Sequence, residues 1–243
     1  MTAILGIAGI LLASFIKGAI GFGFPAVSTP LLALVMDVKQ AVAILILPNM
    51  VMDGVQAFRR RGLVTTLRRH ATLYACGIGG TFVGTKLLAF VSPQLALGIL
   101  GGFVLTFVGV NARTVVLSVP PEWEWFLSPS VGFAVGVVGG ITNVQGPPLV
   151  LYFYALGVPK LEFVRSISIS FFIYKAAQLA ALIQFGLMTR SLFGLSVLAS
   201  ALSLGTFWLG LKVQDRIPQA LFNRATLYFL GLLGGVLVVR ALT

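Results

Sequence analysis

The segment that most constrains the fold is Gly139–Leu149, GGITNVQGPPL, because no uninterrupted helix can pass through it. Its prolines lack backbone N–H groups and clash with the preceding turn, while its glycines allow backbone angles that other residues avoid. We expect one helix to end here and another to begin at Pro147 or Pro148, since proline fits the first turn of a helix. A helix broken inside a membrane is costly unless its free backbone groups face protein, water or a ligand. The segment is therefore a candidate functional site.

Composition places this segment in a membrane. Of the 243 residues, 58% are hydrophobic and 9% are charged, and the mean hydropathy is +1.03. Soluble domains have about 25% charged residues, so we predict an all-α integral membrane protein without a sizeable soluble domain. The net charge of +11 would suggest nucleic acid in a soluble protein, but here the basic residues cluster at the ends of apolar runs. This is what the positive-inside rule requires, and we expect no nucleic-acid partner.

The few reactive side chains argue against an enzyme. Cys76 is the only cysteine and His70 the only histidine, which excludes an internal disulfide and leaves almost no ligands for zinc. The histidine lies in a basic stretch, away from any Ser/His/Asp arrangement. GIGG at Gly77–Gly80 lacks the preceding strand and the following lysine of a nucleotide-binding loop. We predict no metal, no cofactor and no ATP-driven step.

Hydrophobic runs and their breaks predict about five helices in each half of the chain. In the first half we expect 3–21, broken at Gly21–Pro25, a short run to 36, then 39–58, 71–91 and 94–114, with a basic loop at Arg59–His70. In the second half we expect 130–143, a break at Thr142–Pro147, a short run 147–157, then 160–185, 191–212 and 218–241. The short runs, at about 10–12 residues and about 1.5 Å per residue, are half-helices that cannot cross a core of about 30 Å.

An ordered series of matches indicates an internal duplication. Gly18 and Pro30 match Gly136 and Pro148 at an offset of 118, and GTF recurs from 80–82 to 205–207 at an offset of 125. We predict repeat 1 at about 1–115, a linker at about 116–129 and repeat 2 at about 130–243. If the basic loop is cytoplasmic, equivalent loops of the two halves face opposite sides of the membrane. This is the signature of inverted repeats.

Two half-helix N-termini meeting near the middle of an inverted fold would favour an anion, because each has unpaired amides and a partial positive charge. The helix dipoles alone are too weak to offset dehydration of a charged substrate, so polar side chains must contribute. The residues predicted to bind the substrate are Gly21, Gly23, Ser28, Thr29, Asn49, Thr142, Asn143, Gln145, Gly146, Pro147, Lys175 and Gln178. The alternative is that the polar residues among them only cap the broken helices.

Lys175 lies about fifteen residues into its predicted helix, near the middle of the membrane. A lysine there is costly and is expected to face the interior of the bundle. Contact with an anion, pairing with Asp53 and snorkelling to the interface all remain open at this point. Asn49, Ser166 and Ser170 are candidates for a second wall of the site, although serine in a membrane helix often bonds its own backbone.

The paired motifs resemble those of the TauE/SafE sulfite exporter-like permeases. The first is KGAIGFGFPAVSTPLLAL at Lys17–Leu34, and the second is GVVGGITNVQGPPLVLYFYALGV at Gly136–Val158. Many family members have three consecutive glycines in these motifs, whereas here Phe22 and Phe24 interrupt the first. The resemblance implies an inverted-repeat secondary carrier, often an exporter, for sulfite, organosulfonates or other small anions.

Together these features predict a secondary transporter of a small anion, sulfite or an organosulfonate, that works by alternating access. The alternatives are an anion channel or a non-transporting membrane scaffold. The expected location is a bacterial inner membrane, crossed several times, with membrane lipid as the surrounding partner. Coupling to protons or another ion, the direction of transport and assembly into a homodimer stay open.

Overall fold

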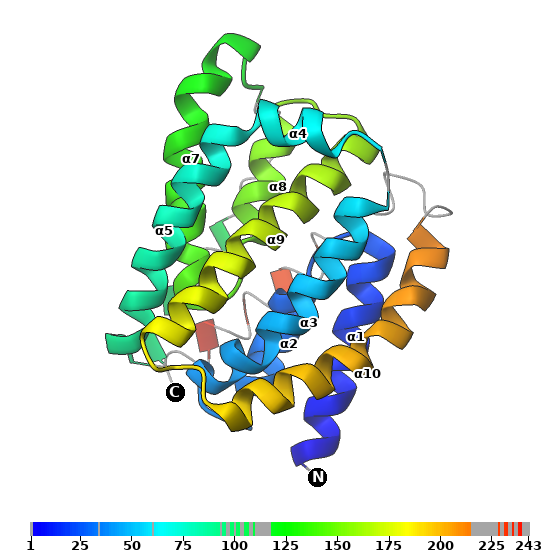
Figure 1. Cartoon of the computed structure of the whole chain (residues 1–243), viewed down its shortest axis with the longest axis vertical. Helices are drawn as coiled ribbons and strands as arrows, with labels where there is room; N and C mark the ends of the chain where they lie inside the picture. Colours follow the sequence, from blue (N-terminus) through cyan, green and yellow to red (C-terminus); the bar gives the residue numbers. More distant parts are fainter. Residues whose placement is uncertain are drawn as a thin grey trace.

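The computed structural model describes residues 2–33, 35–59, 61–92 and 118–214, with short pieces between 94 and 109 and between 228 and 239. In this part of the chain the fold is all-helical (Figure 1). The nine named helices are α1 (Thr2–Ile20), α2 (Phe24–Ala33), α3 (Val38–Phe58), α4 (Leu63–Arg69), α5 (Ala71–Phe90), α7 (Pro121–Thr142), α8 (Gly146–Ala155), α9 (Lys160–Gln184) and α10 (Arg190–Gln214).

Five of these helices, α3, α5, α7, α9 and α10, are long and apolar enough to cross a membrane. At about 1.5 Å per residue, their 20 to 25 residues match a hydrocarbon core of about 30 Å. The short helices α2 and α8, with 10 residues each, cover about half of that thickness. The protein is therefore a multi-pass integral membrane protein that contains two half-length helices.

The two helices that precede the breaks, α1 and α7, are each followed by a residue with left-handed backbone angles. Gly21 follows α1 with a φ of 94°, and its N–H donates to the Lys17 carbonyl at 2.7 Å. Asn143 follows α7 with a φ of 66°, and its N–H donates to the Gly139 carbonyl at 2.8 Å. Glycine and asparagine are the residues that tolerate this conformation at a helix C-terminus. A new helix begins a few residues after each break: α2 begins at Phe24 and α8 begins at Gly146.

Glycines allow two pairs of helices to pack with their backbones in contact. A Cβ atom at Gly80 of α5 would overlap the Phe133 carbonyl of α7, and one at Gly136 of α7 would overlap the Gly77 carbonyl of α5. In the same way, a Cβ atom at Gly18 of α1 would overlap the Phe207 carbonyl of α10. Small residues at such spacings are typical of membrane helices that approach closely. Both pairs join a helix from the first half of the chain to one from the second.

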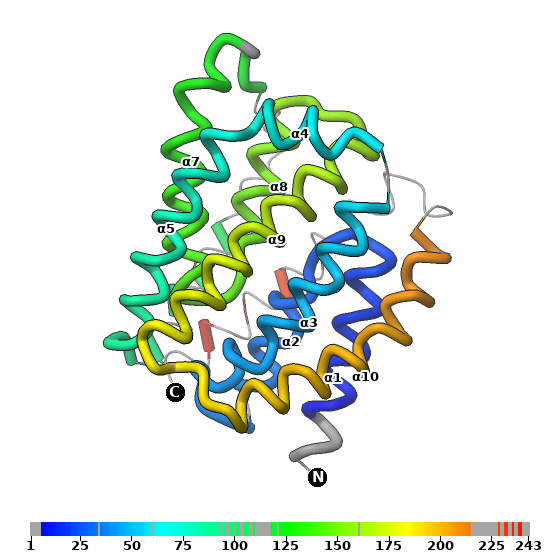
Figure 2. The backbone as a smooth tube through the Cα atoms, viewed as in Figure 1, coloured from blue at the N-terminus to red at the C-terminus, as the bar shows by residue number. Residues whose placement is uncertain are grey.

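The central pair, α3 and α9, lies between these two pairs (Figure 1). In Figure 2 the chain ascends through α3 and descends through α9, so the two helices run in opposite directions. The fully buried polar residues Asn49 and Asp53 lie on α3, and Lys175 and Gln178 lie on α9. This central pair therefore positions most of the buried polar side chains that the site uses.

The predicted helix bounds agree with the structure over most of the described residues, with two differences. The stretch expected to be a basic loop contains α4, which begins after Gly62 with a φ of 106°. The expected linker ends at Pro120, because α7 begins at Pro121 and continues through Pro129. Proline at the first helical position and the acidic residues Glu122 and Glu124 in the first turn both favour a helix start there. The helices expected at 94–114 and 218–241 lie largely outside the described residues.

Candidate functional site

The second break is held by side chains of α9. Gln178 donates from Nε2 to the carbonyl oxygens of Gly139 and Gly140, both at 3.3 Å. Lys175 donates from Nζ to the Asn143 carbonyl at 3.0 Å, to Asn143 Oδ1 at 2.5 Å and to Gln178 Oε1 at 2.7 Å. A cation at the C-terminus of α7 lies at the negative end of its dipole and satisfies carbonyls that the helix leaves free.

These contacts require the charged form of Lys175. Gln178 uses its nitrogen for two backbone carbonyls, so its oxygen must face the lysine. Asn143 donates from Nδ2 to Thr29 Oγ1 at 3.1 Å, so its oxygen must face the lysine as well. Three acceptors around one nitrogen need three N–H donors, which only the ammonium form supplies. Lys175 is therefore a buried positive charge with no carboxylate among its hydrogen-bond partners.

A second buried cluster lies beside the first break. Lys17, near the end of α1, donates to Asp53 Oδ1 at 2.5 Å and to Asn49 Oδ1 at 3.1 Å. All three side chains are completely buried. Pairing between Lys175 and Asp53, one of the alternatives open from the sequence, is not what the structure has, because the carboxylate binds Lys17. Asp53 nevertheless lies close enough to Lys175 to interact with it electrostatically.

Phe171 of α9 lies beside Lys17 and beside the N-terminus of α8. The Lys17 Nζ atom lies 5.3 Å from the centre of the Phe171 ring. A Cβ atom built at Gly146 would lie 3.8 Å from Phe171 Cζ, and no other neighbouring atom would come within 4 Å of it. Lys17 thus faces one part of the ring and the N-terminus of α8 lies near another. An aromatic ring also gives Lys17 a favourable cation–π contact.

Several buried polar groups around these clusters have no hydrogen-bond partner. They include Asn49 Nδ2, both side-chain polar atoms of Gln145, Ser166 Oγ and Asp53 Oδ2. The exposed fraction of each of these side chains is 1% or less. Buried polar groups are normally paired, because an unpaired one costs about 1–3 kcal/mol. An anion or its water shell would accept hydrogen bonds from such unpaired donors, which lie close to buried cations.

The half-helix N-termini supply fewer amides than the sequence suggests. Pro147 and Pro148 follow Gly146 in the first turn of α8, and they have no N–H to donate. In the first turn of α2, Pro25 has the same effect. An anion at either helix end would therefore depend on side chains such as those of Asn49 and Gln145 more than on backbone donors.

The predicted site residues divide into those that the structure brings together and those that it does not. Thr29, Asn143, Lys175 and Gln178 form one hydrogen-bond network. Asn49 belongs to the Lys17 cluster, and Gly21 and Gly23 form the first break. Ser28 and Thr142 donate to the carbonyls of Phe24 and Val138 in their own helices, and Ser170 donates to the Ser166 carbonyl. These three hydroxyls follow the capping and back-bonding alternative.

Sequence reasoning missed Lys17 and Phe171 in this region, and it considered Asp53 only as a possible partner of Lys175. Lys17 lies four residues before Gly21, in the last turn of α1, and that position could have indicated a charge beside the break. Asn49 and Asp53 are four residues apart and so share a face of α3. Phe171 and Lys175 have the same spacing on α9. The sequence offers no signal that places Phe171 beside Lys17 and the N-terminus of α8.

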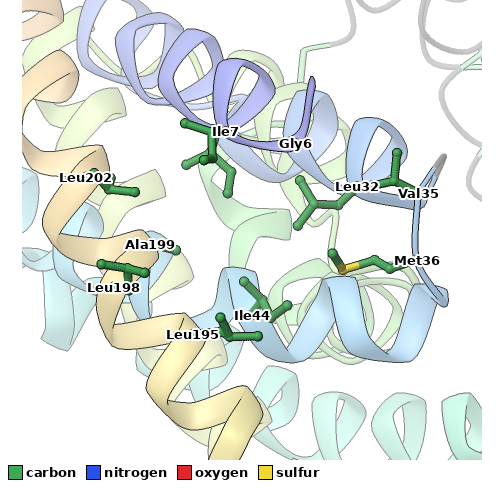
Figure 3. Close-up of a pocket in the computed structure, with 11 residues that line it drawn as sticks. Gly6, Ile7, Leu32, Val35, Met36, Ile44, Leu195, Leu198, Ala199 and Leu202 are labelled. Carbon is green, nitrogen blue, oxygen red and sulfur yellow. The ribbon is translucent and has the colours of Figure 1, made fainter. Parts of the chain in front are cut away.

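A separate pocket of about 360 Å³ opens between α1, the α2–α3 connection and α10. Its lining is apolar, and Figure 3 shows Ile7, Leu32, Ile44 and Leu198 pointing into it. Without a polar or charged side chain this pocket cannot hold an anion. It is distinct from the polar clusters described above.

Apart from these polar clusters and the pocket, charged residues connect α4 and α5 with the first turns of α7 and α9. Arg69 binds Glu124 of α7 at 3.0 Å and Glu162 of α9 at 3.1 Å. The hydrogen bonds that Arg69 donates to the Glu124 carboxylate raise the pKa of Arg69. His70 Nδ1 lies 3.1 Å from Glu124, but burial lowers the pKa of this histidine and favours its neutral form. We call this set of four residues the basic-end cluster, and it connects α4 and α5 to α7 and α9.

Comparison with known proteins gives one match. The family model described as Sulfite exporter TauE/SafE matches residues 5–237. No curated protein and no solved structure matches the chain significantly. The match covers both breaks and every helix that carries a residue of the two polar clusters.

Proposed function

Because the chain belongs to the Sulfite exporter TauE/SafE family, we propose that it is a secondary transporter of sulfite or an organosulfonate. The proposed cargo binds between the two breaks, near the middle of the membrane. The carrying observation is that Lys17, Asp53 and Lys175 are completely buried and leave one uncompensated positive charge. An excess charge inside a membrane protein is costly and marks an ion pathway or substrate site.

The unpartnered groups support the same proposal. A sulfite or sulfonate group has three oxygens that accept hydrogen bonds, and Asn49 Nδ2 and Gln145 Nε2 are donors without a partner. Both side chains are buried. Hydrogen bonds to a charged group contribute about 1.5–3 kcal/mol each, enough to offset part of the dehydration of the anion.

We further propose that the two halves are inverted repeats that exchange helices. The bounds of the helices support this, because α1 and α7 end at Ile20 and Thr142, and α3 and α9 begin at Val38 and Lys160, each time at an offset of 122. This offset lies between the 118 and 125 that the sequence matches give. The end-to-end inversion of α3 and α9 (Figure 2) is what such repeats require.

Two hydrogen bonds repeat at the same offset. Gln56 of α3 donates from Nε2 to the Lys17 carbonyl at 3.3 Å, and Gln178 of α9 donates from Nε2 to the Gly139 carbonyl at 3.3 Å. Donors and acceptors are both 122 residues apart. In each half a glutamine of the long helix thus caps the end of the helix that breaks. At this offset Asp53 corresponds to Lys175, so the two halves carry opposite charges at equivalent positions.

Labelling of single cysteines tests the inversion. After Cys76→Ala, a cysteine in place of Thr65 on α4 and one in place of Thr189 before α10 are expected to react from opposite sides of the membrane. Both threonines are exposed, so each cysteine is accessible to a charged maleimide. Labelling of both from the same side, in sealed vesicles of known orientation, would rule out inverted repeats.

Flux into liposomes tests the function. We expect the purified protein to exchange radiolabelled sulfite or a small sulfonate at carrier rates, with accumulation that follows an imposed gradient. Vesicles with the Asn143→Leu variant, which loses the hydrogen bonds to Lys175 and Thr29, provide the matched control. Rates typical of channels, without coupling to a gradient, would favour an anion channel. Equal leak in protein-free and protein-containing vesicles would leave only a non-transporting scaffold.

A further inference from the structure

The three completely buried charged side chains of the described membrane core have a net charge of +1. Lys17 and Asp53 form an ion pair, and the hydrogen-bond partners of Lys175 are all neutral oxygens. We propose that this charge count selects a cargo with a single negative charge, such as hydrogen sulfite or a simple sulfonate, and that Asp53 is the residue that sets the selectivity. This inference rests on the proposed function and adds the charge class of the substrate.

The elements around the site contribute no further compensation. Among the buried residues that the structure describes, no Asp, Glu, Lys or Arg lies on α2, α5, α7, α8 or α10. The carboxylates of Glu124 and Glu162 belong to the basic-end cluster, where they bind Arg69. The net charge at the two breaks is thus determined by Lys17, Asp53 and Lys175.

A monoanion bound beside these residues brings the total to zero, whereas a dianion leaves one uncompensated negative charge. In a low-dielectric interior, an unpaired charge is far more costly than a paired one. Asp53 Oδ2 has no hydrogen-bond donor beside it, and the negative carboxylate would repel a second negative charge on the cargo. The same carboxylate that holds Lys17 therefore acts against dianions, and it is a specificity-determining residue.

Two probes of almost the same shape separate charge from size. Sulfoacetate has two negative charges at pH 7.5, and sulfoacetamide has one, because its carboxylate is replaced by an amide. We expect wild-type protein in detergent to bind sulfoacetamide more tightly by isothermal calorimetry. Asp53→Asn raises the site from +1 to +2 and should shift the affinity ratio toward sulfoacetate. The expected shift is about 15–30-fold, the effect of one added charge at about 8–10 Å with an effective dielectric constant of about 20.

A second variant tests the charge count apart from the identity of Asp53. Lys17→Met combined with Asp53→Asn removes the ion pair and keeps the net charge at +1. This double variant should retain the wild-type preference for sulfoacetamide. If Asp53→Asn alone fails to fold, the double variant still provides a test, because Lys17 is not left buried without its carboxylate partner. Glu162→Gln, which removes a carboxylate from the basic-end cluster, should leave the ratio unchanged.

The outcomes separate this inference from the proposed function. If wild-type protein binds neither probe nor sulfite, the transport proposal fails and the charge selectivity fails with it. If wild-type protein binds the probes but prefers sulfoacetate, or if the ratio in Asp53→Asn stays within twofold of wild type, only the charge selectivity is overturned. A shift toward sulfoacetate in the double variant would also contradict it, because the net charge there is unchanged.

Discussion

Lys175→Met is expected to weaken anion binding by at least about thirtyfold and to reduce flux to the level of protein-free vesicles. Removing one unit charge at about 8 Å from a bound anion costs about 2 kcal/mol with an effective dielectric constant of about 20. The variant also leaves Gln178 Oε1 and both oxygens of Asn143 without the ammonium that they bind. Each acceptor left unpaired costs about 1–3 kcal/mol, so the second break loses the arrangement that positions Gln145 and Gly146.

The measurements are calorimetric titration with sulfite and flux in liposomes, alongside a thermal unfolding curve for each variant. Lys86→Met is the matched control, because the same substitution removes an ammonium group from an exposed face of α5. Wild-type affinity in folded Lys175→Met would show that the lysine only caps α7, and the anion site would then have to lie elsewhere.

Gly146→Val is expected to abolish flux while the protein remains folded. Gly146 begins α8, and a Cβ atom there would have only Phe171 Cζ in contact, at 3.8 Å. This is an ordinary van der Waals distance, so the added side chain meets open space rather than neighbouring atoms. If that space is where the anion approaches, valine excludes it. Thermal stability close to wild type together with lost sulfite exchange is the expected pair of results.

Gly79→Val is the control for this substitution. A Cβ atom at Gly79 has nothing within 4 Å, and the residue lies on the exposed face of α5. This variant should keep both stability and flux. Normal exchange by Gly146→Val would mean that the space beside Phe171 is not part of the transport path, and the N-terminus of α8 would be a structural hinge.

The breaks could be predicted from sequence because they depend on local chemistry. Glycine and proline restrict which backbone angles a segment can adopt, and the structure has non-helical residues at 21–23 and 143–145. The burial of Lys175 was predictable for a similar reason, since few other positions are tolerable for a charge in the middle of an apolar helix. Such inferences need no knowledge of which helices are neighbours.

What could not be predicted depends on neighbours that are distant in the chain. Lys17 and Asp53 are 36 residues apart, and nothing in either local sequence distinguishes a pair between them from a pair between Asp53 and Lys175. The start of α7 at Pro121 was misassigned because consecutive prolines can end one helix or begin the next. The position of Phe171 follows only from the packing of α9 against α3, α5 and α8, helices that its local sequence does not identify.

The exchange of helices between halves has a consequence for how the chain enters the membrane. Gly18 of α1 packs against the Phe207 carbonyl of α10. The glycine surface of α1 therefore has no final partner until almost all of the described chain has been synthesised. Lys17 reaches the bilayer before Asp53 does, and a lone lysine there is unfavourable. We therefore expect stable insertion of α1 to wait for α3, so that α1, α2 and α3 enter the membrane as one unit. On this expectation the first half completes its folding only when it packs against the second half.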